Sequence, residues 1–308
     1  MRKFKDYVLL TLKGMGMGAS DVVPGVSGGT IAFIAGIYEE LINSIKSFNL
    51  DAFKALFSLR LTKFWKQVNG NFLFAVFSGI LISVFSLANL LEYLLINHPV
   101  FIWSFFFGLV IASAIVILKD IKKWDLFVAG FFITGFLLAF YITTFSPMQT
   151  REAYWFIFLS GAIAICAMIL PGISGSFILL LLGKYQFILN AVSELKIIVL
   201  FVFTAGAATG LIAFSNFLSW LLKKFRDPTI AMLAGFMGGS LNKIWPWKIT
   251  TETFVDRHGV EHPLIQKNIW PEPSLNSDLL PAIFIALIGF SLIIILTRLS
   301  LKQQNSEA

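Results

Sequence analysis

Charged side chains are scarce in this chain, where Asp, Glu, Lys and Arg together make up 13% of 308 residues. Soluble globular proteins carry roughly 25% charged residues, so a water-soluble enzyme or scaffold is excluded. Cysteine is nearly absent: Cys166 is the only one, which rules out an internal disulfide and a cysteine-based metal cage. We therefore predict no metal site and no cofactor.

Apolar residues fill the place of the missing charges. They make up 57% of the chain, which includes 33 phenylalanines, and the mean hydropathy is +0.82. A membrane-spanning helix needs about 20 mostly apolar residues. Stretches of this kind predict an all-α polytopic membrane protein with about six transmembrane helices: Phe72–Leu95, Val100–Leu118, Leu126–Phe145, Ile198–Leu222, Pro228–Leu241 (short) and Leu279–Leu296.

The chain repeats itself. Pro24-Gly25-Val26-Ser27-Gly28 returns 147 residues later as Pro171-Gly172-Ile173-Ser174-Gly175. Further on, the segment 78–95 resembles 205–222, an offset of 127. The difference arises because the linker 46–70 is longer than its counterpart 193–197. We interpret the chain as a duplication within one membrane domain, 1–308: repeat one is 6–146, repeat two is 153–299, and an outer loop is 245–278.

The basic residues predict the topology. Each half begins with a proline-glycine-interrupted segment and continues with three spans. If both interrupted segments re-enter the membrane, one side collects 16 of the 24 basic residues and the other six. Cytoplasmic loops are enriched in Lys and Arg, so two re-entrant helical hairpins with cytoplasmic amino and carboxyl termini are favoured. The formal charge of +7 thus reflects topology and does not indicate a nucleic-acid partner.

Three spans per half is an odd number, so the second half is expected to be inverted relative to the first. Inverted repeats built around discontinuous helices are a transporter architecture, with the substrate site near the midplane. Proline and glycine interrupt helices, and the predicted helix breaks are Pro24, Gly25, Pro171 and Gly172.

A helix that restarts after each break would present free amides and partial positive charge to an anion. The predicted substrate-binding residues at these helix starts are Ser27, Gly28, Gly29, Thr30, Ser174, Gly175 and Ser176. The alternative is that glycine and serine only let membrane helices pack closely. Recurrence of the motif in both halves favours a functional break.

Five ionisable residues are further candidates. Lys13 and Lys184 lie within the re-entrant segments and could neutralise an anion, or their ammonium groups could extend to an interface. Arg151 could capture an anion on the outer side, although a surface ion pair with its neighbour is the simpler interpretation. Asp21 and Glu39 are candidates for proton or sodium coupling, with a helix cap and an interfacial position as their respective alternatives.

The first motif resembles the signature of a bacterial and archaeal membrane family. The residues that carry the resemblance run from Gly18 through Asp21-Val22-Val23-Pro24-Gly25-Val26-Ser27-Gly28-Gly29-Thr30 to Gly36-Ile37-Tyr38-Glu39, and the second motif, 170–185, is also similar. This family is associated with translocation of polyprenyl phosphate, specifically undecaprenyl phosphate. The resemblance implies a flippase-like transporter in the bacterial cytoplasmic membrane, which returns the lipid carrier to the cytoplasmic leaflet for cell-wall synthesis.

Two other functions stay open at this point. A small-anion or ion transporter or channel could use the same groove. An intramembrane enzyme acting on lipid phosphates would need clustered acid–base and nucleophilic groups, but His98, His258 and His262 all fall outside the predicted spans. The oligomeric state is left open by the sequence.

Overall fold

The computed structural model describes residues 2–22, 26–148, 150–255, 261–271 and 278–307, and it is mostly helical. Five helices contain stretches long and apolar enough to cross a bilayer. They are α6 (Gly70–Asn97), α7 (Pro99–Lys119), α8 (Leu126–Thr144), α12 (Ile197–Lys224) and α14 (Leu279–Glu307). Five of the six predicted spans therefore have long helical counterparts.

The sixth predicted span corresponds to α13 (Arg226–Ser240), which has only 15 residues. At 1.5 Å per residue it is about 22 Å long, shorter than a hydrocarbon core of about 30 Å. Most of its residues are buried, and it packs against α7 and α8. Gly235 and Gly239 allow this close approach, because a side chain at either position would collide with backbone of α8.

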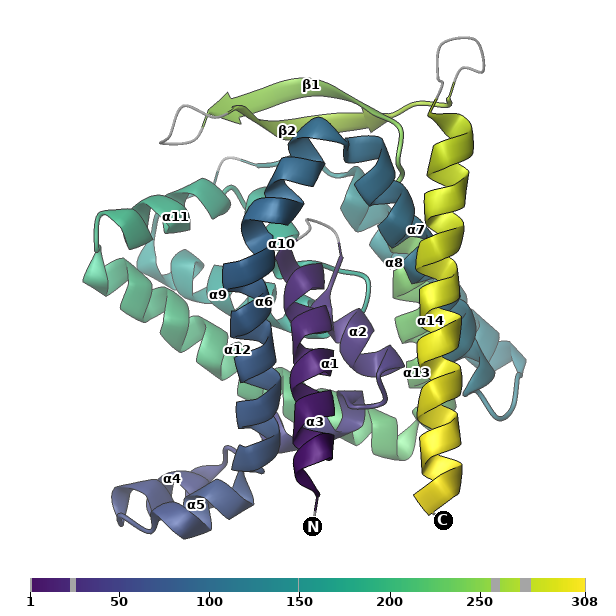
Figure 1. Ribbon diagram of the computed structural model, residues 1–308. Helices are drawn as coiled ribbons and strands as arrows, with labels where there is room; N and C mark the ends of the chain where they lie inside the picture. Colours follow the sequence, from purple (N-terminus) through teal and green to yellow (C-terminus); the bar gives the residue numbers. More distant parts are fainter. Residues whose placement is uncertain (1, 23–25, 149, 256–260, 272–277, 308) are drawn as a thin grey trace.

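One broken segment precedes the long helices of each half. The first consists of α1 (Phe4–Val22), α2 (Gly28–Ile34) and α3 (Tyr38–Lys46), and the second of α9 (Tyr154–Ile169), α10 (Gly175–Leu181) and α11 (Tyr185–Ser193). In Figure 1, α1 rises from the amino terminus to the middle of the molecule, and α2 and α3 return toward the same end. The axes of α10 and α11 differ by 106°.

The element bounds follow the sequence offsets. The starts and ends of α10 and α11 lie 147 residues after those of α2 and α3, and α12 lies 127 residues after α6. Packing follows the same rule: Gly79 of α6 lies against the carbonyl of Thr11, and Gly206 of α12 lies against the carbonyl of Phe158. In both halves, therefore, the first helix and the long helix meet at equivalent glycines.

The linker between α3 and α6 folds into two short helices, α4 (Leu50–Phe57) and α5 (Leu61–Gln67). They lie at the end of the molecule that carries both termini (Figure 1). Phe57, Leu61 and Trp65 are exposed apolar residues beside several lysines. This mixture is typical of helices that lie at a membrane interface.

The prediction of an all-α fold is wrong in the outer loop. Strands β1 (Lys248–Val255) and β2 (Glu261–Asn268) form an antiparallel hairpin across the end opposite to both termini (Figure 1). Threonine, isoleucine and valine are frequent in β1, and such β-branched residues favour strands. The rings of Trp245, Trp247 and Trp270 cluster beside the hairpin, with centroids 5.4–5.6 Å apart.

Candidate functional site

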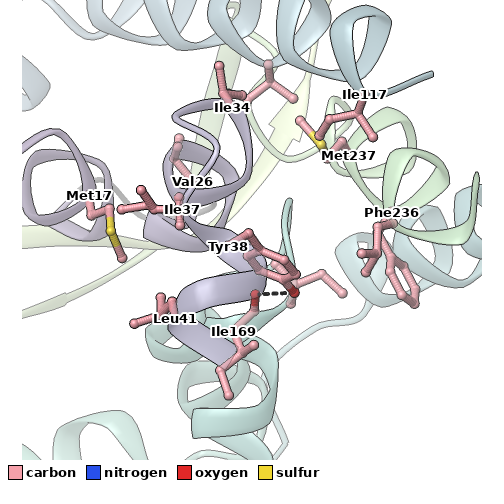
Figure 2. Close-up of a cluster of buried hydrophobic side chains, with 14 of the residues drawn as sticks. Met17, Val26, Ile34, Ile37, Tyr38, Leu41, Ile117, Ile169, Phe236 and Met237 are labelled. Atoms are coloured by element: carbon pink, nitrogen blue, oxygen red, sulfur yellow. Dashed lines mark hydrogen bonds between the residues drawn. The ribbon is translucent and has the colours of Figure 1, made fainter. Parts of the chain in front are cut away.

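The two motifs meet in the structure, although they are far apart in the sequence. The hydroxyl of Ser27 donates to the carbonyl of Met168 at 2.9 Å, and the amide of Gly172 donates to Thr30 Oγ1 at 3.1 Å. Nearby, the Tyr38 hydroxyl donates to the carbonyl of Ile169 at 3.1 Å, the dashed line in Figure 2. Three hydrogen bonds thus join the first broken hairpin to the second.

This motif contact, defined by residues 26–30 and 168–174, lies inside the apolar core. Figure 2 shows Met17, Val26, Ile37 and Met237 among the buried side chains around Tyr38. Ser27 and Thr30 have no measurable exposed surface. Hydrogen bonds in such a low-dielectric environment are electrostatically strong, and breaking one leaves a costly unpaired group.

Two glycines make the close approach of the loops possible. Gly172 has φ of +89°, and a side chain there would press on the backbone of Met237. A Cβ atom on Gly29 would collide with the carbonyl oxygen of Ile169. Pro171 and Gly172, predicted as a helix break, lie between the end of α9 and the start of α10. Pro24 and Gly25 lie outside the described residues.

Helix α2 begins where the sequence predicted a helix start, but its first amides bind groups of the protein itself. Ser27 is the N-cap, and its hydroxyl accepts from the Gly29 amide at 3.1 Å. The Gly28 amide donates to Asp21 Oδ1 at 2.7 Å. A carboxylate of the protein therefore occupies the place predicted for the anion of a ligand, and the helix-cap interpretation of Asp21 describes its present contact.

The start of α10 is built differently. Ser174 makes no capping hydrogen bond with its side chain, and its hydroxyl instead lies 2.7 Å from that of Ser176. The residue equivalent to Asp21 is Met168, which offers no carboxylate. Gly175 is buried and faces the carbonyl of Ala164. The two helix starts are thus similar in sequence, but a carboxylate lies against the start of α2 and an uncharged methionine stands at the equivalent position for α10.

Lys13 and Lys184 lie away from the motif contact. Lys13 donates to the carbonyl of Ala35 at 2.7 Å, at the opposite end of α2 from Ser27. A cation there stabilises the last carbonyl groups of the helix. Lys184 is buried just after α10, donates to the carbonyl of Thr150 at 3.0 Å, and lies over aromatic rings, those of Phe156 and Phe187.

The structure does not bring Arg151 or Glu39 to the motif contact. Arg151 is exposed in the segment that precedes α9. Glu39 is exposed near the start of α3, and one of its carboxylate oxygens is 3.9 Å from Nε of Arg226. Both residues lie away from the loops in which the two broken segments meet.

A second polar region, which the sequence analysis did not identify, lies beneath the β-hairpin. It is a cavity of about 380 Å³ with three lysines in its wall, Lys243, Lys248 and Lys267. The sequence identified these lysines only as three of the six basic residues predicted to lie on the outer side. Their convergence depends on how the hairpin folds over the ends of α8, α10 and α13.

Within the described part of the chain, no three His, Cys, Asp or Glu side chains come close enough to hold a metal ion. His98 lies between α6 and α7, and His262 belongs to β2. His258 is outside the described residues. The arrangement therefore offers hydroxyls, amides and lysines that can bind an anion.

A polytopic helical protein with two broken hairpins whose tips meet in its core has the architecture of a membrane transporter. The chain belongs to the VCA0040-like family of undecaprenyl phosphate translocase-like proteins, whose sequence profile matches residues 17–262. The resemblance noted from the motifs is thereby confirmed.

Two relatives extend over most of the chain. A Vibrio cholerae protein named polyprenyl-phosphate transporter is 47% identical over 269 residues, which cover 87% of each chain. A Staphylococcus aureus protein of the same name is 35% identical over 265 residues, covering 80% of this chain and 88% of the relative. No solved structure matches the chain.

Proposed function

We propose that this protein transports a polyprenyl phosphate, specifically undecaprenyl phosphate, across the cytoplasmic membrane and returns it to the cytoplasmic leaflet for cell-wall polymer synthesis. Family membership and the names of both relatives support the substrate class. The observation that carries the proposal is the hydrogen-bonded contact between the two motif loops. A contact between two separate hairpins can act as a barrier that opens and closes.

We further propose that the halves form an inverted repeat, with the end that carries the termini facing the cytoplasm. The shared offsets of the broken helices and the equivalent glycine contacts support the repeat. The basic linker 46–70 lies at the same end as both termini, and the β-hairpin lies at the other (Figure 1). This distribution agrees with the enrichment of Lys and Arg in cytoplasmic loops.

The motif contact is the proposed crossing point of the phosphate head. Moving an isolated charge into hydrocarbon is very costly, so the head needs hydroxyl and amide donors while its prenyl tail stays in lipid. Donors of this kind come from both halves, and the proposed substrate-binding set is Ser27, Gly28, Gly29, Thr30, Ser174, Gly175 and Ser176. Alternating separation of the hairpins would expose these groups first to one side and then to the other.

Asp21, rather than the exposed Glu39, is the coupling group in this proposal. Its carboxylate accepts from the Gly28 amide and thereby competes with a phosphate for the same donor. Protonation or cation binding at Asp21 would weaken its hold on the amide and favour substrate binding. Lys13, Lys184 and Arg151 are assigned supporting roles along the hairpins, where they can attract the head group electrostatically.

The test is transport of labelled undecaprenyl phosphate in vesicles that contain the purified, folded protein, with and without an imposed proton gradient. We expect protein-dependent movement of the label between leaflets, in contrast to vesicles without protein. Absence of movement would refute the function. Flux of inorganic phosphate without lipid movement would indicate a small-anion transporter, and release of phosphate from the lipid would indicate an enzyme.

A further inference from the structure

The cavity beneath the β-hairpin is a partly enclosed chamber. Its volume is about 380 Å³, within the range of small-molecule pockets. Its wall combines the end of α8 and the residues after it, the second half of α10, the turn after α13, and both strands. The lining residues at these places are Thr143–Pro147, Phe177, Leu180, Leu181, Asn242, Lys243, Lys248 and Ile265–Asn268.

The charge of this chamber is of one sign. Its lining includes three lysines and no acidic residue. The neighbouring cavity of about 490 Å³, in contrast, contains Glu152 and Glu252 together with Lys184. The chamber is therefore electrostatically suited to an anion, whereas its neighbour has a mixed wall.

The lysines play different parts. Lys248 donates to the carbonyl of Lys243 at 2.6 Å, and its ammonium lies 3.6 Å from the ring centroid of Trp103 in α7, so it fastens the hairpin to the helices. The Lys243 ammonium is 4.6 Å from the ring centroid of Phe177 and has no hydrogen-bond or ion-pair partner among the described residues. It is thus the cation available to a ligand.

Among the described residues that line the chamber, none is an acidic residue that would compensate these lysines. Burial lowers the pKa of the Lys243 ammonium. Burial also lowers the pKa of Lys248, and the nearby positive charge of Lys243 lowers it further. An anion placed in the chamber would reverse both effects, because an opposite charge favours the charged form of a lysine.

Neutral donors and an apolar wall complete the chamber. Asn242 bridges α8 and β2: its Nδ2 donates to Thr143 Oγ1 at 3.0 Å, and its oxygens accept from Asn268. Phe177, Leu180 and Leu181 of α10 contribute apolar surface, and Phe177 lies directly beside the Lys243 ammonium. A basic group beside an apolar surface suits an amphiphile with a phosphate head and a hydrocarbon tail.

The chamber shares a helix, α10, with the motif contact. Its apolar wall is formed by α10, a helix of seven residues that begins next to Ser174. At 1.5 Å per residue, α10 is about 10 Å long. A head group bound beside Lys243 would therefore lie about one short helix away from the motif contact, on the side of the molecule opposite to the termini.

We propose that this chamber captures the phosphate monoester head of the lipid from the outer leaflet, with Lys243 as its principal binding residue, before the head moves to the motif contact. The inference rests on the proposed function, since it gives that transport a first binding step. Lys248 and Asn242 are positioning residues in this scheme, and Lys267 contributes long-range charge.

The test measures binding to the full chain in lipid nanodiscs by tryptophan fluorescence. Trp103 contacts Lys248 in the wall, and Trp245 donates to the carbonyl of Ile269, next to the lining residue Asn268. The probes are farnesyl phosphate, farnesol and inorganic phosphate. We expect farnesyl phosphate to bind at least tenfold more tightly than the other two. Lys243→Gln should weaken its binding by about tenfold, the scale of one charge-assisted hydrogen bond, and Lys243→Arg should restore most of it.

Lys196→Gln is the matched control, because Lys196 is paired with Glu194 at 2.8 Å and does not line the chamber. It should bind farnesyl phosphate like the wild type. If Lys243→Gln perturbs the fold, Lys267→Gln provides a second variant at an exposed position in the wall, and it should weaken binding by about threefold at low salt. Unchanged binding in folded Lys243→Gln protein overturns the inference.

Inorganic phosphate that competes as well as farnesyl phosphate also overturns it, because the site would then recognise free phosphate. The vesicle assay separates the two proposals. If the wild type transports the lipid and Lys243→Gln does so with the same half-saturating concentration, only the capture site fails. If the wild type transports nothing, the proposed function itself fails.

Discussion

The amide of Gly172 donates a hydrogen bond to the hydroxyl of Thr30 across 142 residues of sequence. Each of the two residues belongs to the motif that interrupts one hairpin. Because both are buried, this bond cannot be replaced by water while the loops remain in contact. One hairpin therefore cannot move away from the other without leaving a polar group unpaired or meeting a new partner.

Replacement of Thr30 by Val should weaken this contact. The change keeps the shape of the side chain but removes the acceptor, and an unpaired buried amide costs about 1–3 kcal/mol. We expect a lower apparent melting temperature in detergent. We also expect faster uncoupled transport, measured as lipid movement in the absence of an imposed gradient.

Two variants control for this result. Thr30→Ser retains the hydroxyl and should keep most of the stability. Thr11→Val removes a hydroxyl that bonds only within its own helix, to Tyr7 at 3.0 Å, and should have a smaller effect. Equal melting temperatures for Thr30→Val and the wild type would show that the bond between the motifs contributes nothing.

Gly172→Ala and Gly36→Ala form a second comparison. Both glycines have positive φ, +89° and +69°, so alanine introduces backbone strain of about 1–2 kcal/mol at each. Only at Gly172 does the added Cβ meet backbone, that of Met237, whereas nothing lies within 4 Å at Gly36. We expect Gly172→Ala to lose more stability and most of its transport, while Gly36→Ala stays active. The reverse order would contradict the assigned role of the second break.

Asp21→Asn separates the charge of this side chain from its capping contact. Asparagine keeps an acceptor oxygen for the Gly28 amide, so the fold should survive. Transport driven by a proton gradient should fall by about tenfold or more, because the neutral side chain can no longer titrate. Asp21→Ala should in addition lose about 1 kcal/mol of stability through the missing cap.

The measurement is lipid transport in vesicles at fixed internal pH, with the gradient imposed or collapsed. Glu39→Gln serves as the control, since Glu39 is exposed and outside the motif contact. A wild-type response to the gradient in Asp21→Asn would remove Asp21 from the coupling step.

Single-cysteine labelling tests the proposed topology. Cys166 is the only native cysteine, so a Cys166→Ser background leaves each introduced thiol alone. Ser58→Cys, on the exposed end of α4, should react with an impermeant reagent only from the cytoplasm. Thr250→Cys, exposed in β1, should react only from outside. Labelling of both from one side would refute the proposed orientation.

Periodic and repeated features were predictable because local chemistry fixes them. Of the six spans that long apolar stretches predicted, five correspond to long helices, and a helix begins at Gly28, shortly after the predicted break at Pro24 and Gly25. The β-hairpin was missed because its alternating pattern is short and lies among prolines and tryptophans in a predicted loop. Asp21 was considered as a cap, but its bond to Gly28 joins residues seven positions apart, a pairing that no local pattern specifies.

The sequence by itself determined that the chain is a membrane protein and that a Pro-Gly-x-Ser-Gly motif recurs at an offset of 147 residues, since these properties depend on composition and spacing. Tertiary structure alone decided which groups meet: Thr30 with Gly172, Asp21 with Gly28, and Lys243 with the wall of α10. These contacts depend on how closely the helices approach one another. Glycines such as Gly79 and Gly206 permit a close approach, but the local sequence does not indicate which segment will lie against them.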